Sequence, residues 1–383
     1  MNKYDIAVIG GGMIGAAIAV GFAQQGRSVV VVDGVCPSEF ESHQAMDIRV
    51  SAISEQSVAL LEKLGAWEAI EAMRVCPYRR LETWEHPECR TRFDAASLGL
   101  NQLGYIVENR VLQLGLWQQF AQYDNLTVIC PDTLKQIEFA SSNRVILQSG
   151  DAFYADWVIG ADGANSQVRQ LAGIGVTAWD YRQHCMLISV ETELAQQDMT
   201  WQQFTPSGPR SFLPLCGHQG SLVWYDSPQR IRQLKALNAT QLRAEILAAF
   251  PDELGDIRVL DKGAFPLVRR HAQQYAKHQC VLVGDSAHTI NPLAGQGVNL
   301  GFKDVAVLLE ESQGRELQDR ILQRYERRRR PDNLLMQTGM DLFYKGFSNE
   351  LPPLKWARNA ALKLAEHSGP IKQQVLKYAL GMG

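Results

Sequence analysis

The sequence predicts an α/β protein in which a Rossmann-like domain is interrupted by an inserted antiparallel-sheet domain and followed by a helical C-terminal segment. Three observations support this fold class: a strand–glycine turn–helix–strand pattern at the N-terminus, period-two alternation in the middle of the chain, and a basic, helically periodic C-terminal stretch. A chain of 383 residues is long enough for about two or three domains with a substantial core.

Composition narrows the class of protein. The net charge of -3 and the 21% of charged residues are ordinary for a soluble protein. The chain begins almost at once with a strand, so we expect no signal peptide, and no apolar run approaches the ~18 residues of a membrane span. The seven cysteines are scattered without a Cys-x-x-Cys pair, which predicts reduced thiols in a cytoplasmic protein and no zinc site. The eight histidines form no metal-binding spacing, so we expect no metal.

The first element is the N-terminal stretch 4–34, "YDIAVIGGGMIGAAIAVGFAQQGRSVVVVDG". Its unalternating apolar runs are typical of parallel strands covered on both faces. Gly10, Gly12 and Gly15 form Gly-x-Gly-x-x-Gly, which permits a tight turn, close approach of a pyrophosphate and close helix–strand packing. A glycine-rich turn of another α/β unit is the alternative, but Asp33 ends the second strand where an acid can bind ribose hydroxyls. The pattern therefore predicts a dinucleotide, FAD or NAD, because an acid disfavours the 2′-phosphate of NADPH.

Two further strand ends carry an acid. Asp162 follows "WVIG" and precedes a glycine and a helix, and Asp285 follows "CVLVG". An N-cap role is the alternative for Asp162. The connection that contains Asp285 is about fifteen residues long, and this length is unusual for a turn between a strand and a helix. We expect the strand ends at 10–15, 160–163 and 284–285 to meet at one crevice of a doubly wound sheet.

In these three motifs the chain resembles the single-component flavin monooxygenases of the para-hydroxybenzoate hydroxylase type. The resemblance implies that FAD is the dinucleotide, with Asp285 on its ribitol and Asp162 near its pyrophosphate. Residues 47–54 and 107–113 resemble flavin-contacting segments, which assigns Arg49 and Gln113 to the cofactor.

The chain departs from that family at two positions. Asn109 stands where many members have Arg, and Ser286 stands where Ala is commoner. The first departure puts one flavin contact in question, and the second is small enough to be tolerated.

The loop after Asp285 carries the remaining cofactor assignments. The resemblance implies that Pro292 stiffens this loop and that Gly295 and Gly297 let the backbone approach the flavin ring. A helix beginning near Val298 would then point its N–H groups at the ring, which is anionic when reduced. NAD(P)H is the expected electron donor and O₂ the co-substrate, and the single Gly-x-Gly-x-x-Gly indicates that NAD(P)H has no domain of its own.

The middle of the chain is expected to hold the substrate. Residues 185–227 alternate with period two, which predicts antiparallel strands, and residues 229–250 predict one or two amphipathic helices. Phe212, Trp224 and Tyr225 are the candidate walls of an aromatic substrate site, and a core role is the alternative for each.

A narrower resemblance covers residues 1 to about 380. The stretches 78–85, 200–215, 221–234 and 339–354 resemble the ubiquinone-biosynthesis hydroxylases, and among them the group that acts on a demethoxy quinol. This implies that NAD(P)H reduces FAD, that O₂ adds at flavin C4a and that the electron-rich ring of a polyprenylated benzoquinol takes the oxygen. The sequence assigns no catalytic side chain. A sister hydroxylase acting at another ring position and a non-catalytic FAD-binding scaffold of the same assembly are the alternatives, and the Trp-x-Trp-x-Ile-Pro stretch of the related halogenases is not found.

These readings predict a discontinuous domain organisation. The FAD-binding domain takes 1–72, 99–172 and 272–340, the substrate domain takes 73–98 and 173–271, and a helical C-terminal segment takes 341–383.

The C-terminal stretch is basic, with 13 Lys or Arg and 8 Asp or Glu in residues 311–383. The run "YERRRRPDN" reads as a solvated helix end, where cations are favourable, and no other feature points to nucleic acid. The later, helically periodic part would dock on its own domain, on a partner of a biosynthetic assembly, or on an anionic membrane. We therefore expect a cytoplasmic protein in peripheral contact with the inner face of the membrane.

Overall fold

The computed structural model describes residues 2–290, 296–347, 353, 355, 358–360 and 363. Pro292, Gly295 and most of the predicted segment 341–383 lie outside the described residues, so their assignments stay predictions.

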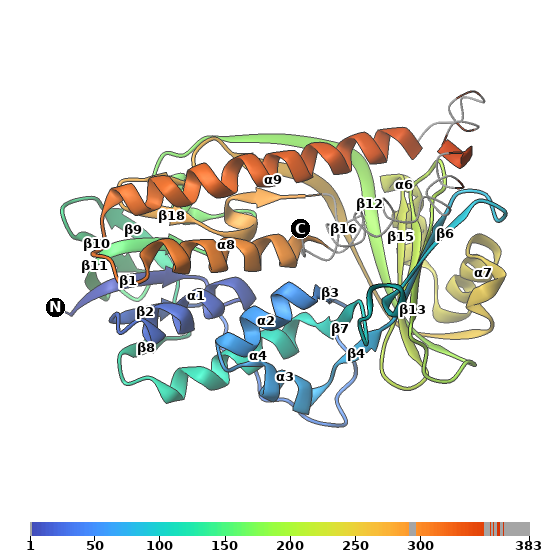
Figure 1. Ribbon diagram of the computed structural model, residues 1–383, viewed down its shortest axis with the longest axis horizontal. Helices are drawn as coiled ribbons and strands as arrows, with labels where there is room; N and C mark the ends of the chain where they lie inside the picture. The colour runs from blue at the N-terminus through green and yellow to red at the C-terminus, as the bar shows by residue number, and fades with distance from the viewer. Residues whose placement is uncertain are drawn as a thin grey trace.

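The first sheet has the strand order β17-β18-β11-β1-β2-β8, with β10 and β9 continuing it beside β11 (Figure 1). Its strands are β1 (Lys3–Ile9), β2 (Val29–Val32), β8 (Leu126–Ile129), β9 (Leu134–Glu138), β10 (Asn143–Leu147), β11 (Ala152–Gly160), β17 (Ala276–Lys277) and β18 (Cys280–Leu282). The pairs that join β18, β11, β1, β2 and β8 are all parallel. This is the doubly wound sheet that the N-terminal pattern predicts.

Helices and a small sheet surround this layer. The helices of this half are α1 (Met13–Gln24), α2 (Glu55–Lys63), α3 (Trp67–Met73), α4 (Asn109–Gln118), α5 (Gln167–Leu171), α8 (Gln296–Ser312) and α9 (Asp319–Phe347). The small antiparallel sheet consists of β3 (Val50–Ser54), β7 (Gly104–Glu108) and β4 (Cys76–Tyr78). Residues 15–23 of α1 are all buried, because this apolar helix packs between the parallel sheet, α4 and α8. Figure 1 shows α8 and α9 running along the same side of the molecule.

The second sheet has the order β19-β16-β12-β15-β14-β13-β5-β6. Its strands are β5 (Arg80–Trp84), β6 (Arg90–Asp94), β12 (Val176–Thr192), β13 (Met199–Gln203), β14 (Arg210–Pro214), β15 (Gln219–Asp226), β16 (Ile257–Ala272) and β19 (His288–Thr289). All of its pairs are antiparallel except β13 with β5. The helices α6 (Pro228–Ala236) and α7 (Ala239–Ala249) cover one face of this sheet, and the other face is turned toward the first half of the molecule (Figure 1). Short 3₁₀ turns occupy Ala95–Leu98, Gln119–Gln122, Asp252–Leu254 and Gly284–Ser286.

The predicted fold class is therefore confirmed, while the domain boundaries stay a prediction. Two pairings cross those boundaries. β4 falls in the range 73–98 but pairs with β7, and β19, from the cofactor loop, pairs with β16.

Two expectations fail in the structure. Cys36 and Cys130 are joined by a disulfide with Cα atoms 5.8 Å apart, although the sequence predicted reduced thiols. These cysteines are far apart in the chain, and the parallel pairing of β2 with β8 brings the ends of their strands together. The arginine run also does not end a helix, because α9 continues through Pro331 to Phe347.

Within the described ranges, no helix combines the length and the apolar character needed to cross a bilayer.

Candidate FAD site

The three predicted strand ends lie next to one another at one edge of the parallel sheet. Ile9 at the end of β1 is in register with Gly160 at the end of β11, and Gly160 is in register with Leu282 at the end of β18. The segments that follow these residues carry the glycine fingerprint, Asp162 and Asp285. Parallel pairing therefore builds one crevice from residues far apart in the chain.

The three glycines of the fingerprint have different physical roles. Gly10 has φ +100°, and a Cβ added there would lie 2.5 Å from the oxygen of Ala161. A Cβ on Gly15 would lie 1.8 Å from the oxygen of Gly10, so helix α1 packs directly against the turn. A Cβ on Gly12 would meet no atom of the described residues within 4 Å. The open space beside Gly12, at the N-terminus of α1, is what a bound pyrophosphate requires.

Asp33 and Gln113 hold the turn from two sides. The carboxylate of Asp33 accepts hydrogen bonds from the backbone N–H of Gly11 at 2.5 Å and of Val35 at 2.8 Å. The side chains of Gln113 and Trp117 donate to the oxygen of Gly11 at 2.8 and 2.6 Å. The sequence reasoning missed Trp117, although it lies one helical turn after Gln113 on α4. The contact of Asp33 with a ribose stays a prediction.

A cavity of about 350 Å³ opens in front of this turn. Its lining includes Gly12, Met13, Ile48, Arg49, Arg110 and Gln113. The predicted residues Gly12, Arg49 and Gln113 thus meet in one cavity. Asn109 lines the same cavity, accepts a hydrogen bond from Ser51 Oγ at 2.7 Å, and is followed by the cation Arg110. Arg110 also lines the cavity, and its guanidinium donates to the backbone oxygens of Ser38 at 3.0 Å and Glu39 at 2.6 Å.

Ser166 is the N-cap residue of α5, and Asp162 supports the same helix start by accepting from its first N–H groups. Its Oδ2 accepts from the backbone N–H of Gln167 at 2.7 Å and of Val168 at 3.1 Å, at the start of α5. Its Oδ1 is buried and has no hydrogen-bond partner among the described residues. Because an unsatisfied buried oxygen is costly, this atom is a candidate contact for a bound ligand.

Asp285 lies in the 3₁₀ turn directly after β18. The side chain is accessible to solvent, yet the surrounding protein raises its pKa, although the charges of His288, Arg49 and Arg270 act in the opposite direction. No hydrogen bond joins its side chain to another described residue, so its oxygens are available to a ligand.

Ser286 joins the two strand ends behind Asp285. Its Oγ donates to the oxygen of Gly160 at 2.5 Å and lies 2.7 Å from the oxygen of Val283, and the residue is 1% exposed. The hydroxyl adds contacts between the ends of β11 and β18, which already pair through their backbones, and an alanine could not form these contacts.

A buried polar network fixes the loop beneath Asp285. Asp304 of α8 is 0% exposed, and its Oδ2 accepts from His288 Nε2 at 2.6 Å and from the N–H of Gly284 at 2.9 Å. Its Oδ1 accepts from Arg329 at 2.8 Å and from Asn333 at 3.2 Å. Burial alone raises the pKa of Asp304, but the charges and hydrogen bonds of His288 and Arg329 outweigh it and lower the pKa to about 2. Asp304 is therefore ionised and ties α8 and α9 to the loop.

The second sheet separates the three predicted substrate residues onto two faces. Phe212 and Trp224 are each 1% exposed and pack under α6 and α7, on the side away from the cofactor cavity. Tyr225 points to the opposite face, where it packs with Cys185, Leu267 and Met340. The alternation of β15 accounts for this, since neighbouring residues of a strand point to opposite faces. Placement under two helices favours the core interpretation for Phe212 and Trp224.

In the part of the chain that the structure describes, three buried hydroxyls on the Tyr225 face have no hydrogen-bond partner. They belong to Tyr225, Ser189 and Ser221. Ser189 and Ser221 are opposite each other in the pairing of β12 with β15, and they are 3% and 1% exposed. Burial, with smaller contributions from Cys185 and Tyr181, raises the pKa of Tyr225 well above its ordinary value. Its hydroxyl is therefore protonated at neutral pH and able to donate a hydrogen bond.

The arrangement fits FAD. With respect to the described residues, open space lies in front of Gly12, a Cβ on Gly297 at the start of α8 would also meet nothing within 4 Å, and Asp162 keeps an unpaired oxygen. Bound FAD would supply a two-electron carrier that NAD(P)H reduces and that activates O₂. Among the residues described, no three His, Cys, Asp or Glu side chains lie close enough together to hold a metal ion.

Comparison with known proteins agrees with this geometry. A family model described as "FAD binding domain" matches residues 3–336. The chain is 54% identical to 3-demethoxyubiquinol 3-hydroxylase of Escherichia coli (strain K12), over 99% of this chain and 98% of that protein. It is 33% identical to ubiquinone hydroxylase UbiL of Rhodospirillum rubrum, over 98% of this chain and 89% of that protein.

Solved structures share the fold. p-Nitrophenol 4-monooxygenase PnpA of Pseudomonas putida DLL-E4 superposes with a TM-score of 0.82 at 17% identity, over 100% of this chain and 99% of that one. HpxO of Klebsiella pneumoniae, solved with FAD and uric acid, superposes with a TM-score of 0.77 at 16% identity, over 98% and 96%. The match to the family model covers most of the chain, and the chain therefore belongs to the FAD binding domain family.

Proposed function

We propose that the chain is an FAD-dependent monooxygenase that uses NAD(P)H and O₂ to hydroxylate the ring of a polyprenylated benzoquinol of the demethoxyubiquinol type. The observation that carries this proposal is the 54% identity to 3-demethoxyubiquinol 3-hydroxylase, which extends over 99% of the chain and so includes the substrate sheet. The cofactor cavity with Gly12, Arg49 and Gln113 supports the same reading.

The substrate ring would lie between the cofactor cavity and the Tyr225 face of the second sheet. Two contacts support this position: Arg49 lies 5.5 Å from the ring of Phe265 on β16, and Gly263 on the same strand faces Ile48. The cavity and the sheet are thus in direct contact. The unpaired hydroxyls of Tyr225, Ser189 and Ser221 would bind the ring oxygens of the quinol, because a buried hydroxyl without a partner is costly until a ligand satisfies it.

The role of the protein in this reaction is positioning and exclusion of water. A quinol ring is already electron-rich, so the chain needs side chains that orient the ring and a site that is closed to solvent. The buried, apolar Tyr225 face, formed with Cys185 and Leu267, provides both.

The test compares lipids and purified protein. A strain that lacks the protein should accumulate a prenylated quinone that lacks one ring oxygen, measured by mass spectrometry of lipid extracts. Accumulation of an early polyprenylphenol would instead identify a sister hydroxylase. The purified, FAD-loaded protein should oxidise NAD(P)H faster with a quinol analogue and add one oxygen to it. A protein that binds FAD but adds no oxygen would be a scaffold subunit.

We further propose a peripheral contact with the membrane, because a polyprenyl substrate resides in lipid. The C-terminal stretch was the expected contact, but its Arg358 forms an ion pair with Glu85 at the end of β5, and the two side chains are only 9% and 5% exposed. Arg358 is thus part of the fold. Lys355 and Lys363 are exposed, and Lys372 lies outside the described residues.

A further inference from the structure

A surface on the outer side of α9 combines exposed apolar and cationic side chains. We call it the α9–β12 face, and it consists of Trp179, Leu334, Leu335, Leu342, Arg320, Arg327 and Lys345. Its apolar members are unusually accessible: Trp179 is 62% exposed, Leu335 65% and Leu342 67%. Successive positions seven residues apart lie on one side of a helix, so Leu335 and Leu342 share a stripe that also includes Arg328.

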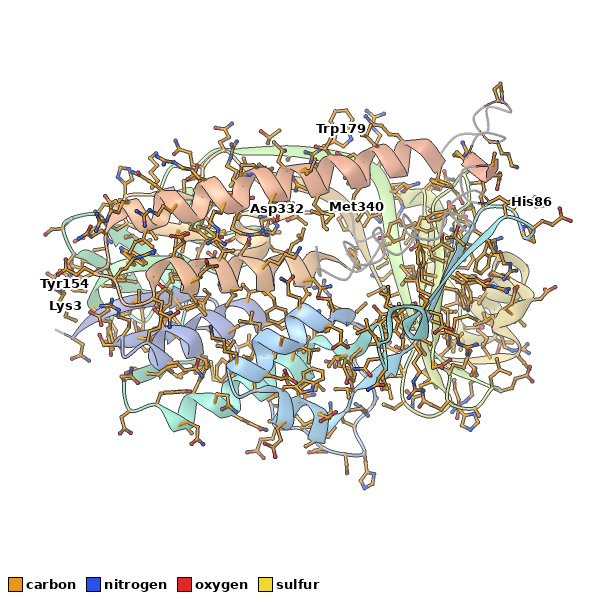
Figure 2. The ribbon with its side chains drawn as sticks, viewed as in Figure 1. Lys3, His86, Tyr154, Trp179, Asp332 and Met340 are labelled. Carbon is orange, nitrogen blue, oxygen red and sulfur yellow. A yellow bond between two sulfur atoms is a disulfide. The ribbon has the colours of Figure 1, made fainter. Side chains whose placement is uncertain are left out.

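Trp179 is held in place on this face. Of the tryptophans that the structure describes, it alone is largely exposed, and Figure 2 shows it at the outer edge of the molecule beside α9. Its ring lies 6.0 Å from Lys345 Nζ of α9. Two residues along β12, Tyr181 donates a hydrogen bond to Asp341 of α9. The strand and the helix are therefore fastened together, and the tryptophan is presented outward by a rigid support.

Two arginines of α9, one in the run 327–330 and one seven residues earlier, supply positive charge to the same face. Arg328 pairs with Glu310 and Glu311, and Arg329 is buried on Asp304. Arg327 and Arg320 are exposed and form no ion pair within the described part of the chain. At 1.5 Å per residue, Arg327 lies about 12 Å along the helix from Leu335. The cations and the apolar residues thus form one elongated surface.

We propose that the α9–β12 face is the surface by which the protein lies on an anionic lipid bilayer. Trp and Leu side chains would enter the headgroup boundary while the arginines bind lipid phosphates, as in amphipathic interfacial helices. A chain with a net charge of -3 is repelled as a whole by anionic lipid, so attraction requires a local group of cations such as this one.

The inference rests on the proposed function, because a lipid-soluble quinol gives the protein a reason to reach the bilayer. The inner side of the same helix carries Met340, which packs with Tyr225, and Figure 2 shows Met340 on the side of α9 away from Trp179. One helix therefore separates the lipid surface from the face where we place the substrate.

The experiment measures flotation of full-length, FAD-loaded protein with vesicles of phosphatidylcholine, with and without phosphatidylglycerol. Replacing Arg320 and Arg327 with Gln should weaken binding to the anionic vesicles about 25-fold at low salt, since each cation near the surface contributes about fivefold. Replacing Trp179 and Leu342 with Ser should weaken it at least tenfold.

Matched control variants lie on the helices that cover the second sheet. Arg232→Gln with Lys235→Gln removes two exposed cations of α6, and Leu247→Ser removes a leucine of α7 that is 38% exposed. These controls should bind the vesicles as the unmodified protein does. FAD content and thermal unfolding check that each variant is folded. If the Trp179 and Leu342 variant misfolds, the arginine pair carries the test alone.

Three results would overturn the inference. The unmodified protein fails to float with anionic vesicles, or the face variants float as well as the controls, or light scattering shows that replacing Trp179 and Leu342 splits an oligomer. Turnover of a short-chain, soluble quinol is measured in parallel. If the unmodified protein does not turn over this quinol, the proposed function is contradicted. The vesicle experiment would still test the lipid-binding surface independently.

Discussion

Replacing Asp304 with Asn tests whether the buried network beneath the cofactor loop stabilises both the fold and the FAD site. Asn keeps the size of the side chain but removes its charge. Arg329 and His288 then face a neutral group in a fully buried position. The amide nitrogen of Asn is a donor, and it replaces an oxygen that now accepts a hydrogen bond.

The expected loss follows from two independent estimates. The depressed pKa of Asp304, about 2 against an ordinary value of 3.8, corresponds to about 2 kcal/mol of folding free energy at neutral pH. Breaking a buried ion pair by removing one partner typically costs about 3–5 kcal/mol. We therefore expect the free energy of unfolding of Asp304→Asn to fall by about 3 kcal/mol at pH 7, measured by urea titration.

The pH dependence has a definite sign. Because the pKa is lower in the folded protein, the stabilisation by Asp304 is complete above the unfolded pKa near 3.8 and disappears as the pH falls toward 2. The gap between the two proteins should be constant from pH 7 to about pH 5 and narrow below about pH 4. FAD affinity should fall as well, since Asp304 holds the N–H of Gly284 next to Asp285. Asp319→Asn, at the exposed start of α9, is the control. An unfolding free energy equal to that of the control would refute the reasoning.

Three further predictions concern the cofactor and the substrate. Gly12→Val should leave the apo protein folded, because no atom of the described residues lies within 4 Å of the added Cβ, yet abolish FAD uptake measured by absorbance; Gly15→Val, whose Cβ meets backbone at 1.8 Å, should not fold. If Gly12→Val takes up FAD normally, no pyrophosphate lies there. Asp285→Ala should weaken FAD binding by about 1.5–3 kcal/mol in a fluorescence titration, through loss of a charge-assisted hydrogen bond, and an unchanged affinity would remove its assigned role. Tyr225→Phe should raise the KM for the quinol without lowering stability, whereas Trp224→Phe should lower stability and leave the KM unchanged; the reverse pattern would place the substrate on the other face.

Much of the first sheet and of its cofactor crevice could be predicted from local sequence pattern. Apolar strands without alternation flank the turn at Gly10–Gly15. The structure explains the glycine spacing, because a side chain at Gly10 or Gly15 would collide with backbone atoms. The convergence of Asp162 with Asp285 was also predictable, because parallel strands end at the same edge of a sheet.

The parts that escaped prediction depend on long-range pairing. Cys36 and Cys130 meet because β2 pairs with β8, which no local spacing reveals. Pro331 suggested a helix end, but α9 continues because Asn333 and Gln337 beyond it are anchored in the interior; Gln337, for example, donates to the oxygen of Arg270 at 2.8 Å. In the same way, alternation alone does not say which face of β15 the helices cover. Phe212 and Trp224 were therefore as plausible as Tyr225.

Strand β16 physically connects the two halves of the site. At its C-terminal end, His271 pairs with His288 of the cofactor loop, and in its middle, Phe265 lies beneath Arg49 of the cavity. Further toward its start, the strand pairs with Ser189 of β12 through Asp261. One continuous strand thus fixes the cofactor loop, a cavity cation and the face with the unpaired hydroxyls relative to one another. If FAD and the quinol bind where we propose, the register of β16 would set the distance from the flavin to the ring oxygens, because the backbone of a paired strand is nearly inextensible.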